Sequence, residues 1–163
     1  MMRKESGFTL AELAIVVAVI AIVSIVVIPN FIGWLPKYKL QRAVTDLVAD
    51  MQSAKLKAIK ANRTWAVVFD DANERYFICS DPGGNLIWDG PTGGDTVEKT
   101  VNMASYNAGV TLTVQSPNAF TTFTNRGMSR DTVEVDVTNF NNSASFKVQT
   151  ALAGGIITDQ LQW

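Results

Sequence analysis

The feature that most constrains this sequence is an apolar run near its start that contains one carboxylate. From Leu13 to Ile28 every residue is apolar except Ser24. This run is shorter than the roughly 20 residues that cross a bilayer as a helix, whereas the stretch from Phe8 to Ile28 is long enough. The longer span places Glu12 inside the apolar segment or at its edge. Because a carboxylate is unfavourable there, Glu12 indicates a functional contact.

The apolar segment is rich in β-branched residues, which favour strands in water. In lipid a single segment must satisfy its own backbone hydrogen bonds, so a helix is the conformation that remains. Arg3 and Lys4 precede the segment, and this basic start is expected to stay on the cytoplasmic side.

Two general hypotheses explain this pattern incompletely. A cleavable secretory signal also has a basic start and an apolar core, but the run here is long and no small-x-small site follows it. A plain membrane anchor leaves Glu12 without a role.

A third hypothesis comes from the residues Gly7-Phe8-Thr9-Leu10-Ala11-Glu12 and the apolar stretch behind them. This pattern resembles the class III signal of type IV pilins and type II secretion pseudopilins. The resemblance implies that prepilin peptidase cleaves between Gly7 and Phe8 and N-methylates Phe8. It also implies that Glu12 meets the amino terminus of a neighbouring subunit during assembly. Two buried opposite charges offset each other's desolvation, which gives this pairing a physical basis.

After the apolar run the pattern changes to that of an amphipathic helix. The apolar residues recur every three or four positions, at Leu40, Val44, Leu47, Met51, Ala54 and Ala58. This spacing predicts a helix over residues 37–62 whose apolar face covers a sheet. Between the two helical segments Pro29 is expected to break the helix, with bending or local melting across 29–36.

The rest of the chain predicts β structure. Period-2 alternation and turn residues indicate strands at 65–69, 75–79, 85–88, 97–103, 110–115, 119–124, 132–138, 143–150 and 156–161. The predicted fold class is α+β: a long N-terminal helix, with a hydrophobic projecting half and an amphipathic second half, packed on a C-terminal antiparallel β domain. The predicted organisation is a leader (1–7), a transmembrane and assembly helix (8–36), an amphipathic helix (37–62) and a β-rich domain (63–163).

Two C-terminal patterns give a closer resemblance. Phe123-Thr124-Asn125-Arg126-Gly127 and Ala153-Gly154-Gly155-Ile156 resemble the GspH/FimT group of minor pseudopilins and minor pilins. Gly155 stands where that group often has arginine. The resemblance implies a structural minor subunit of a type II secretion pseudopilus or type IV pilus, in protein secretion or pilus assembly. It implies a single-pass inner-membrane protein with a periplasmic C-terminal domain. Its partners would be prepilin peptidase, membrane lipid before assembly, and other pilin or pseudopilin subunits.

Composition argues against catalysis. The chain has no histidine, which removes the commonest general base and metal ligand, and no nucleophile comes with a recognisable base. We therefore predict no enzyme activity, no cofactor and no metal site. The single cysteine, Cys79, cannot form an intramolecular disulfide and reads as a small buried hydrophobic residue. The acidic loops 70–74 and 89–95 lack the ligand spacing of an EF-hand, so turn formation explains them better than calcium binding.

DNA binding is the alternative function of a minor pilin in DNA uptake. The net charge is −1, and the stretch 154–163 carries no lysine or arginine to neutralise phosphates. Arg126 and Arg130 are the remaining candidates for a DNA contact, so the sequence does not favour a nucleic-acid partner. A simple membrane-anchored β domain is the other alternative.

Overall fold

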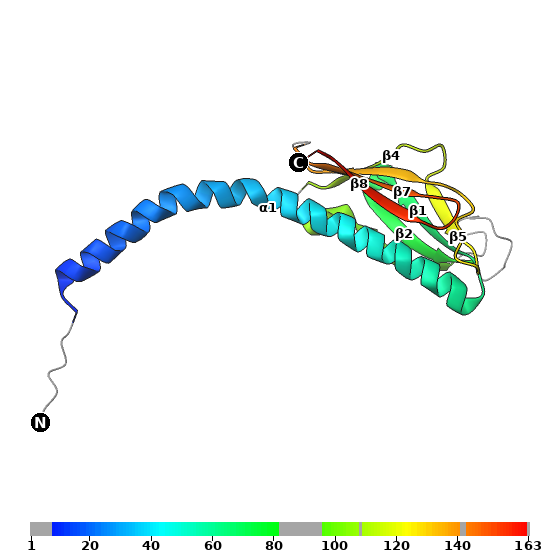
Figure 1. Ribbon diagram of the computed structural model, residues 1–163, viewed down its shortest axis with the longest axis horizontal. Coiled ribbons are helices and arrows are strands. Elements are labelled where there is room, and N and C mark those ends of the chain that lie inside the picture. The colour runs from blue at the N-terminus through cyan, green and yellow to red at the C-terminus, as the bar shows by residue number, and fades with distance from the viewer. Residues whose placement is uncertain (1–7, 82–95, 108, 141–142, 163) are drawn as a thin grey trace, which may run out of the picture. The chain divides into compact units, whose positions relative to one another are not determined.

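The computed structural model of this chain describes residues 8–81, 96–107, 109–140 and 143–162. The chain divides into two compact units, Met1–Leu35 and Pro36–Trp163. The helix α1, Leu10–Ala61, begins in the first unit and ends in the second, and the described strands all follow it (Figure 1).

In the first unit, α1 is apolar on all sides. Its large side chains are exposed wherever the structure describes them, from Leu13 at 60% to Ile25 at 74%. Ser24, the polar residue in this stretch, donates its hydroxyl hydrogen to the carbonyl of Ile20 at 2.7 Å. A helix without a polar face is suited to an apolar environment supplied from outside the chain.

The backbone of α1 is helical through Pro29, where the sequence predicted a break. A proline removes one N–H donor, while the backbone hydrogen bonds on either side can persist. The expectation of local melting across 29–36 is therefore corrected, and the bend expected there stays a prediction.

In the second unit, one face of α1 packs into the core. All six residues of the predicted stripe are buried: Leu40, Val44, Leu47, Met51, Ala54 and Ala58. The helix ends one residue before Asn62, which adopts φ +51°. The N–H of Arg63 bonds to the carbonyl of Ala58, and that of Asn62 to the carbonyl of Ile59. This is the Schellman arrangement that closes many helices.

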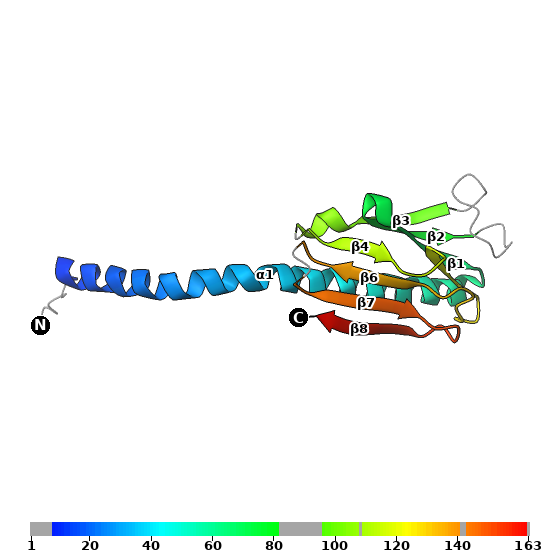
Figure 2. The same ribbon diagram turned by 90° about the horizontal axis from the view of Figure 1, so that it is seen from above.

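The strands form two antiparallel sheets of four strands each. The first has the order β3-β2-β1-β5, with β1 Trp65–Asp70, β2 Arg75–Ser80, β3 Thr96–Asn102 and β5 Phe120–Phe123. The second has the order β4-β6-β7-β8, with β4 Thr111–Val114, β6 Glu134–Thr138, β7 Ser145–Thr150 and β8 Ile156–Gln162 (Figure 2). Two short 3₁₀ helices, η1 Asp71–Asn73 and η2 Met103–Tyr106, lie in the connections.

These elements confirm the predicted α+β class and the antiparallel sheet. The alternation seen in the sequence corresponds to burial, since Val133, Val135 and Val137 all point into the core. The predicted strand at 85–88 lies outside the described residues.

Polar side chains also join the two sheets. The buried hydroxyl of Thr121 in β5 lies 3.3 Å from that of Thr150 in β7. The carboxylate of Glu74 accepts the N–H of Leu112 in β4 at 2.6 Å. These bonds satisfy polar groups that the packing of the two sheets removes from water.

Candidate functional site

The first turn of α1 holds the carboxylate that the sequence singled out. The hydroxyl oxygen of Thr9 accepts the N–H of Glu12 at 3.2 Å. The carboxylate of Glu12 lies 3.5 Å from both the N–H and the hydroxyl of Thr9. Thr9 and Glu12 thus form a capping box, in which a residue before the helix and one in its first turn satisfy each other's backbone donors.

The capping box leaves Glu12 able to take a further partner. Hydrogen bonds from N–H groups are normally about 2.7–3.2 Å long, so contacts of 3.5 Å from Thr9 are weak. The first turn of a helix is also where a carboxylate is favoured by the helix dipole. Phe8, two residues before the helix, is 79% exposed, and Gly7 lies outside the described residues.

The apolar part of α1 supplies a large surface around this carboxylate. Nothing in the described chain covers the side chains from Leu13 to Ile25, most of which are at least half exposed. Contiguous exposed apolar surface on this scale indicates contact with another protein or with lipid. Within the described residues, no helix is both long and apolar enough to cross a membrane.

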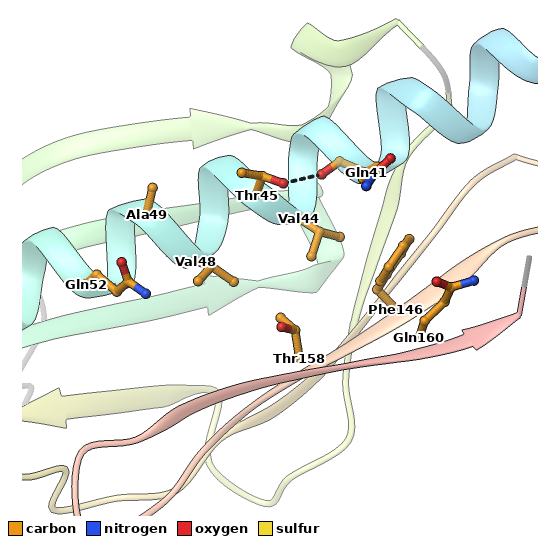
Figure 3. Close-up of a pocket in the computed structure, with 9 residues that line it drawn as sticks. All are labelled: Gln41, Val44, Thr45, Val48, Ala49, Gln52, Phe146, Thr158 and Gln160. Atoms are coloured by element: carbon orange, nitrogen blue, oxygen red, sulfur yellow. Dashed lines mark hydrogen bonds between the residues drawn. The ribbon is translucent and has the colours of Figure 1, made fainter.

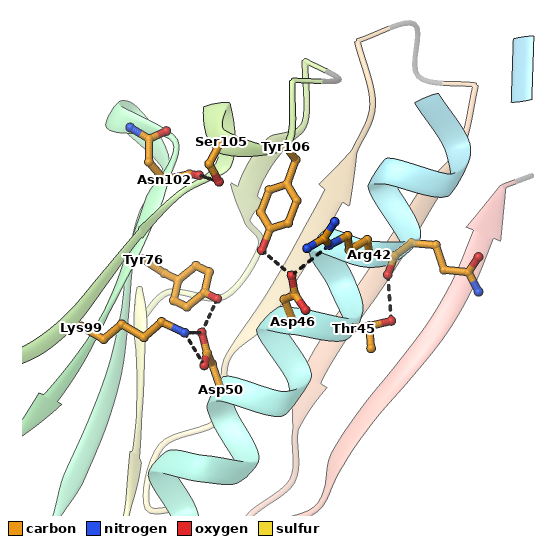
Figure 4. A network of polar contacts seen from close by, with 10 residues as sticks. Arg42, Thr45, Asp46, Asp50, Tyr76, Lys99, Asn102, Ser105 and Tyr106 are labelled. Atoms are coloured by element: carbon orange, nitrogen blue, oxygen red, sulfur yellow. Dashed lines mark hydrogen bonds and ion pairs between the residues drawn. The ribbon is translucent and has the colours of Figure 1, made fainter. Parts of the chain in front are cut away.

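A second polar cluster fixes the amphipathic half of α1 to the first sheet (Figure 4). Asp50 accepts the hydroxyl of Tyr76 at 2.7 Å and the ammonium of Lys99 at 2.7 Å. One helical turn earlier, Asp46 accepts the hydroxyl of Tyr106 at 3.0 Å. Because a charged acceptor strengthens a hydrogen bond, these contacts orient the helix on the sheet.

Both tyrosines in this cluster stay protonated at neutral pH. Burial, and then the hydrogen bond to Asp50, raises the pKa of Tyr76 far above its usual value. Burial, followed by the hydrogen bond to Asp46, raises the pKa of Tyr106 to about 12. Neither group therefore titrates in the range where a general base acts, and the cluster reads as structural.

Replacing Asp50 by alanine is expected to destabilise the sheet domain by about 2–3 kcal/mol, because the fully buried Tyr76 and the Lys99 ammonium lose their acceptor. The matched control is Asp46→Ala. The Asp46 carboxylate is about half exposed, so its removal is expected to lower the free energy of unfolding by about 1 kcal/mol or less. Urea unfolding of both variants measures the difference, and equal losses would contradict this account.

A groove lies between α1 and the edge of the second sheet (Figure 3). Its volume is about 510 Å³, and it is lined by Gln41, Val44, Thr45, Val48, Ala49, Gln52, Phe146, Thr158 and Gln160. The lining contains no charged side chain and no nucleophile with a base. This groove has the chemistry of a contact surface and not that of a reaction centre.

The candidate DNA residues lie together on one turn after β5. Arg126 and Arg130 line the same surface hollow of about 400 Å³, with Met128 between them. No other basic side chain lines this hollow among the described residues. The two arginines alone provide few phosphate contacts, and their role in DNA binding stays a prediction.

The glycines of the two C-terminal patterns meet at this turn. A Cβ on Gly154 would lie 1.9 Å from the carbonyl oxygen of Gly127, and both residues have positive φ. Lys55 of α1 also reaches this point, where its ammonium donates to the carbonyl of Gly154 at 2.8 Å. Only glycine permits this approach of two backbones. The glycines of the two sequence patterns are therefore explained by packing.

The acidic turn 70–74 is occupied by local contacts. The carboxylate of Asp70 accepts from Arg75 at 2.8 Å and from the side chain and backbone of Asn73. The bond from Arg75, and then that from Asn73, lowers the pKa of Asp70. Across the described residues, no three acidic, cysteine or histidine side chains are grouped to hold a metal ion. The loop 89–95 lies outside them, and Cys79 is buried in β2.

A helix with an apolar, motif-bearing first half and an amphipathic second half packed on antiparallel sheets defines a pilin-like protein. Comparison with known families supports this class. Residues 43–154 match the family described as Type II transport protein GspH, and residues 2–28 match the prokaryotic N-terminal methylation motif. Since the first match covers more than half of the sequence, the chain belongs to the GspH family of pseudopilins and minor pilins.

Similar curated proteins include a type II secretion protein and a type IV pilus protein. The Type II secretion system core protein G of Vibrio cholerae is 48% identical over 48 residues, which are 29% of this chain and 33% of that protein. The chain therefore spans about a third of the length of this relative. The Type IV wide pilus major component of Thermus thermophilus is 32% identical over 119 residues, covering 61% of this chain and 90% of that protein.

Similar solved structures share the fold. The minor pseudopilin EpsH of the Vibrio cholerae Type 2 Secretion System has a TM-score of 0.59 at 9% identity, covering 75% of this chain and 97% of that chain. The type IV minor pilin FimU of Pseudomonas aeruginosa has a TM-score of 0.58 at 18% identity, covering 76% and 90%.

Sequence reasoning missed three features of these sites. The capping role of Thr9 was readable from the Thr-x-x-Glu spacing at residues 9–12. The contact between Gly127 and Gly154 and the bonds from Tyr76 to Asp50 join distant parts of the chain. No local pattern carries that information.

Proposed function

We propose that this chain acts as a minor structural subunit of a type II secretion pseudopilus or a type IV pilus. Residues 1–7 are a leader that prepilin peptidase removes, and the same enzyme methylates the new amino terminus at Phe8. The observation that carries the proposal is the position of Glu12, in the capped first turn of an exposed apolar helix and four residues after Phe8.

Before assembly, the apolar half of α1 resides in the inner membrane, and the sheet domain faces the periplasm. Lipid, and later neighbouring subunits, cover the apolar side chains that the chain itself leaves exposed. In the filament Glu12 pairs with the charged amino terminus of a neighbouring subunit. A mispaired subunit would bury an unpaired charge, which costs several kcal/mol, so the pair selects the correct register.

The proposed role is structural and not catalytic. Its partners are prepilin peptidase during maturation and other pilin or pseudopilin subunits afterwards. The uncharged groove between α1 and the second sheet and the exposed turns of the domain are surfaces that such neighbours could contact.

Mass spectrometry of the chain expressed with an active prepilin peptidase is expected to find N-methylated Phe8 as the first residue. The proposed cleavage site directly precedes Phe8 and Thr9, the two described residues before Leu10, and neither of them is helical. Cells without the peptidase and a Gly7→Leu variant provide the controls, and both should retain the leader. An intact leader in the presence of active peptidase would overturn the proposed maturation.

A further inference from the structure

The last strand of the second sheet has an open edge. Within the described residues β8 pairs with β7 alone, and no strand lies along its other side (Figure 2). The pairing with β7 is regular from Ile156 to Gln160, and the irregularity in this ladder comes after that stretch. An open edge presents backbone N–H and C=O groups that a further strand can bond. A strand from outside the chain can therefore extend the sheet at β8.

Strand β8 also lacks the features that protect the other sheet edges. Natural proteins protect such edges with short strands, charged side chains and prolines. β4 and β5 are only four residues long, and β3 carries Glu98 and Lys99. β8 has seven residues, no proline and one charged residue, Asp159. Among the described strands it is therefore the edge best suited to accept a partner strand.

The groove between α1 and the second sheet lies on the inner side of β8 (Figure 3). Thr158 of β8 is paired with Val148 of β7, and Val148 is buried in the core. Because paired residues of neighbouring strands point to the same face, Thr158 also points inward. Thr158 and Gln160 are nevertheless exposed, and both line the groove. The inner face of the sheet is therefore uncovered along β8.

The opposite wall of this groove belongs to α1 and carries no charge. Four exposed residues of the helix recur there every three or four positions, at Gln41, Thr45, Ala49 and Gln52. This spacing places them on one side of the helix. Val48 and Phe146 also line the groove and are partly buried apolar residues. The groove therefore accepts uncharged side chains and offers them apolar surface.

The outer face of the same sheet indicates which charge a further strand would carry. Asp136 of β6, Lys147 of β7 and Asp159 of β8 lie directly opposite one another. Lys147 also pairs with Glu134, so these three carboxylates and one ammonium have a net charge of −2. Asp159 is exposed and accepts the neutral amide of Gln149 at 3.3 Å. A cation facing Asp159 from a further strand would extend the alternation of charge and reduce the excess.

We propose that β8 and the groove bind an extended segment of another protein, which adds a strand to the second sheet. The backbone of this segment pairs with the open edge of β8. Its side chains at every second position are uncharged and enter the groove, and the side chain that faces Asp159 is lysine or arginine. The open edge favours a strand over a helix as the occupant, and the excess negative charge selects a basic segment. The site lies wholly within Pro36–Trp163 and does not depend on the proposed place of the chain in a filament.

The test measures binding of a labelled peptide to the full chain in detergent micelles by fluorescence anisotropy. The probe matches β8 in length, with seven residues. Valine alternates with threonine along it, and its central residue is lysine. Two control peptides carry N-methyl groups on either the odd or the even residues, because the N–H groups of alternate residues point to the same edge of a strand. One control is expected to bind at least about tenfold more weakly, and the other like the parent peptide. Equal affinities of the two controls, as a helical occupant would give, would overturn strand addition.

Exchange of charge at Asp159 tests the basic position. A peptide with glutamate at its centre is expected to bind about tenfold more weakly than the lysine peptide, because like charges then face each other. In Asp159→Lys the preference is expected to reverse. Asp71→Lys changes the same charge at an exposed residue of η1 and is expected to keep the preference for lysine. A preference for lysine that persisted in Asp159→Lys would show that Asp159 does not face the bound segment.

A charge placed in the groove tests the site of binding. Ala49→Glu is expected to weaken binding of the lysine peptide by about tenfold or more, because valine side chains cover this wall and would bury the carboxylate. Leu56→Glu is the matched control, since Leu56 is on the same helix, 65% exposed and not part of the lining. Circular dichroism checks that both variants stay folded. Equal losses, or no binding to the unaltered chain at about 1 mM peptide, would overturn the inference. A chain that bound no peptide but formed a dimer that Ala49→Glu dissociates would replace the foreign segment by a second copy.

Discussion

Replacing Glu12 by glutamine is expected to leave the helix capped and the chain in the membrane but to stop its incorporation into filaments. Glutamine keeps an oxygen that can accept from Thr9, so the capping box survives. What it lacks is the negative charge. In the proposed filament this leaves the amino terminus of a neighbour as a buried unpaired charge, at a cost of about 3–5 kcal/mol per contact. Incorporation is measured by the amount of the variant in sheared and pelleted filaments.

The control for this prediction separates capping from charge pairing. Thr9→Val removes the hydroxyl that accepts the N–H of Glu12 but keeps the carboxylate. Its expected cost is about 1 kcal/mol of helix stability, with incorporation largely retained. If Glu12→Gln assembled normally while Thr9→Val did not, Glu12 would be a helix cap and not the pairing group.

Replacing Gly154 by alanine is expected to destabilise the sheet domain by about 3 kcal/mol. The new Cβ would lie 1.9 Å from the carbonyl oxygen of Gly127, and φ +77° is unfavourable for alanine by about 1–2 kcal/mol. Moving the backbone to relieve the overlap adds about 1–3 kcal/mol. We expect the melting temperature of the domain to fall by about 10 °C, as measured by circular dichroism.

The next residue provides a matched control. A Cβ on Gly155 would have Ala151 as its nearest neighbour at 3.8 Å, which is an ordinary contact. Gly155→Ala is therefore expected to change stability by less than about 1 kcal/mol. If both variants were equally stable, the close approach of Gly127 and Gly154 would not be required by the fold.

Much of the architecture followed from local patterns. The stripe from Leu40 to Ala58 predicted the buried face of α1, because residues three and four positions apart share one side of a helix. Period-2 alternation located the described strands, because residues two positions apart share one face of a strand. Of the two outcomes predicted across 29–36, local melting is contradicted, because the backbone is helical there, and the bend stays a prediction; a proline's effect depends on the helix around it.

Local patterns of this kind did not predict the polar contacts of the domain. Asp50 lies off the predicted apolar stripe, yet it is the acceptor for Tyr76 and Lys99 from two different strands. Likewise, the ammonium of Lys55 in α1 donates to the carbonyl of Gly154, which lies 99 residues later in the sequence. Whether a charged residue meets water or a partner depends on how distant elements pack.

By itself the sequence determined the motif around Glu12, the apolar segment behind it and the faces of the helix and strands. Those features depend on the chemistry of residues within about one helical turn or one strand of each other. The tertiary structure decided that Asp50 meets Tyr76 and Lys99, and that two remote glycines meet where no side chain fits. It also decided which carboxylates are already paired. The reason is that hydrogen-bond geometry and backbone approach are set only when the sheets and the helix close on one core.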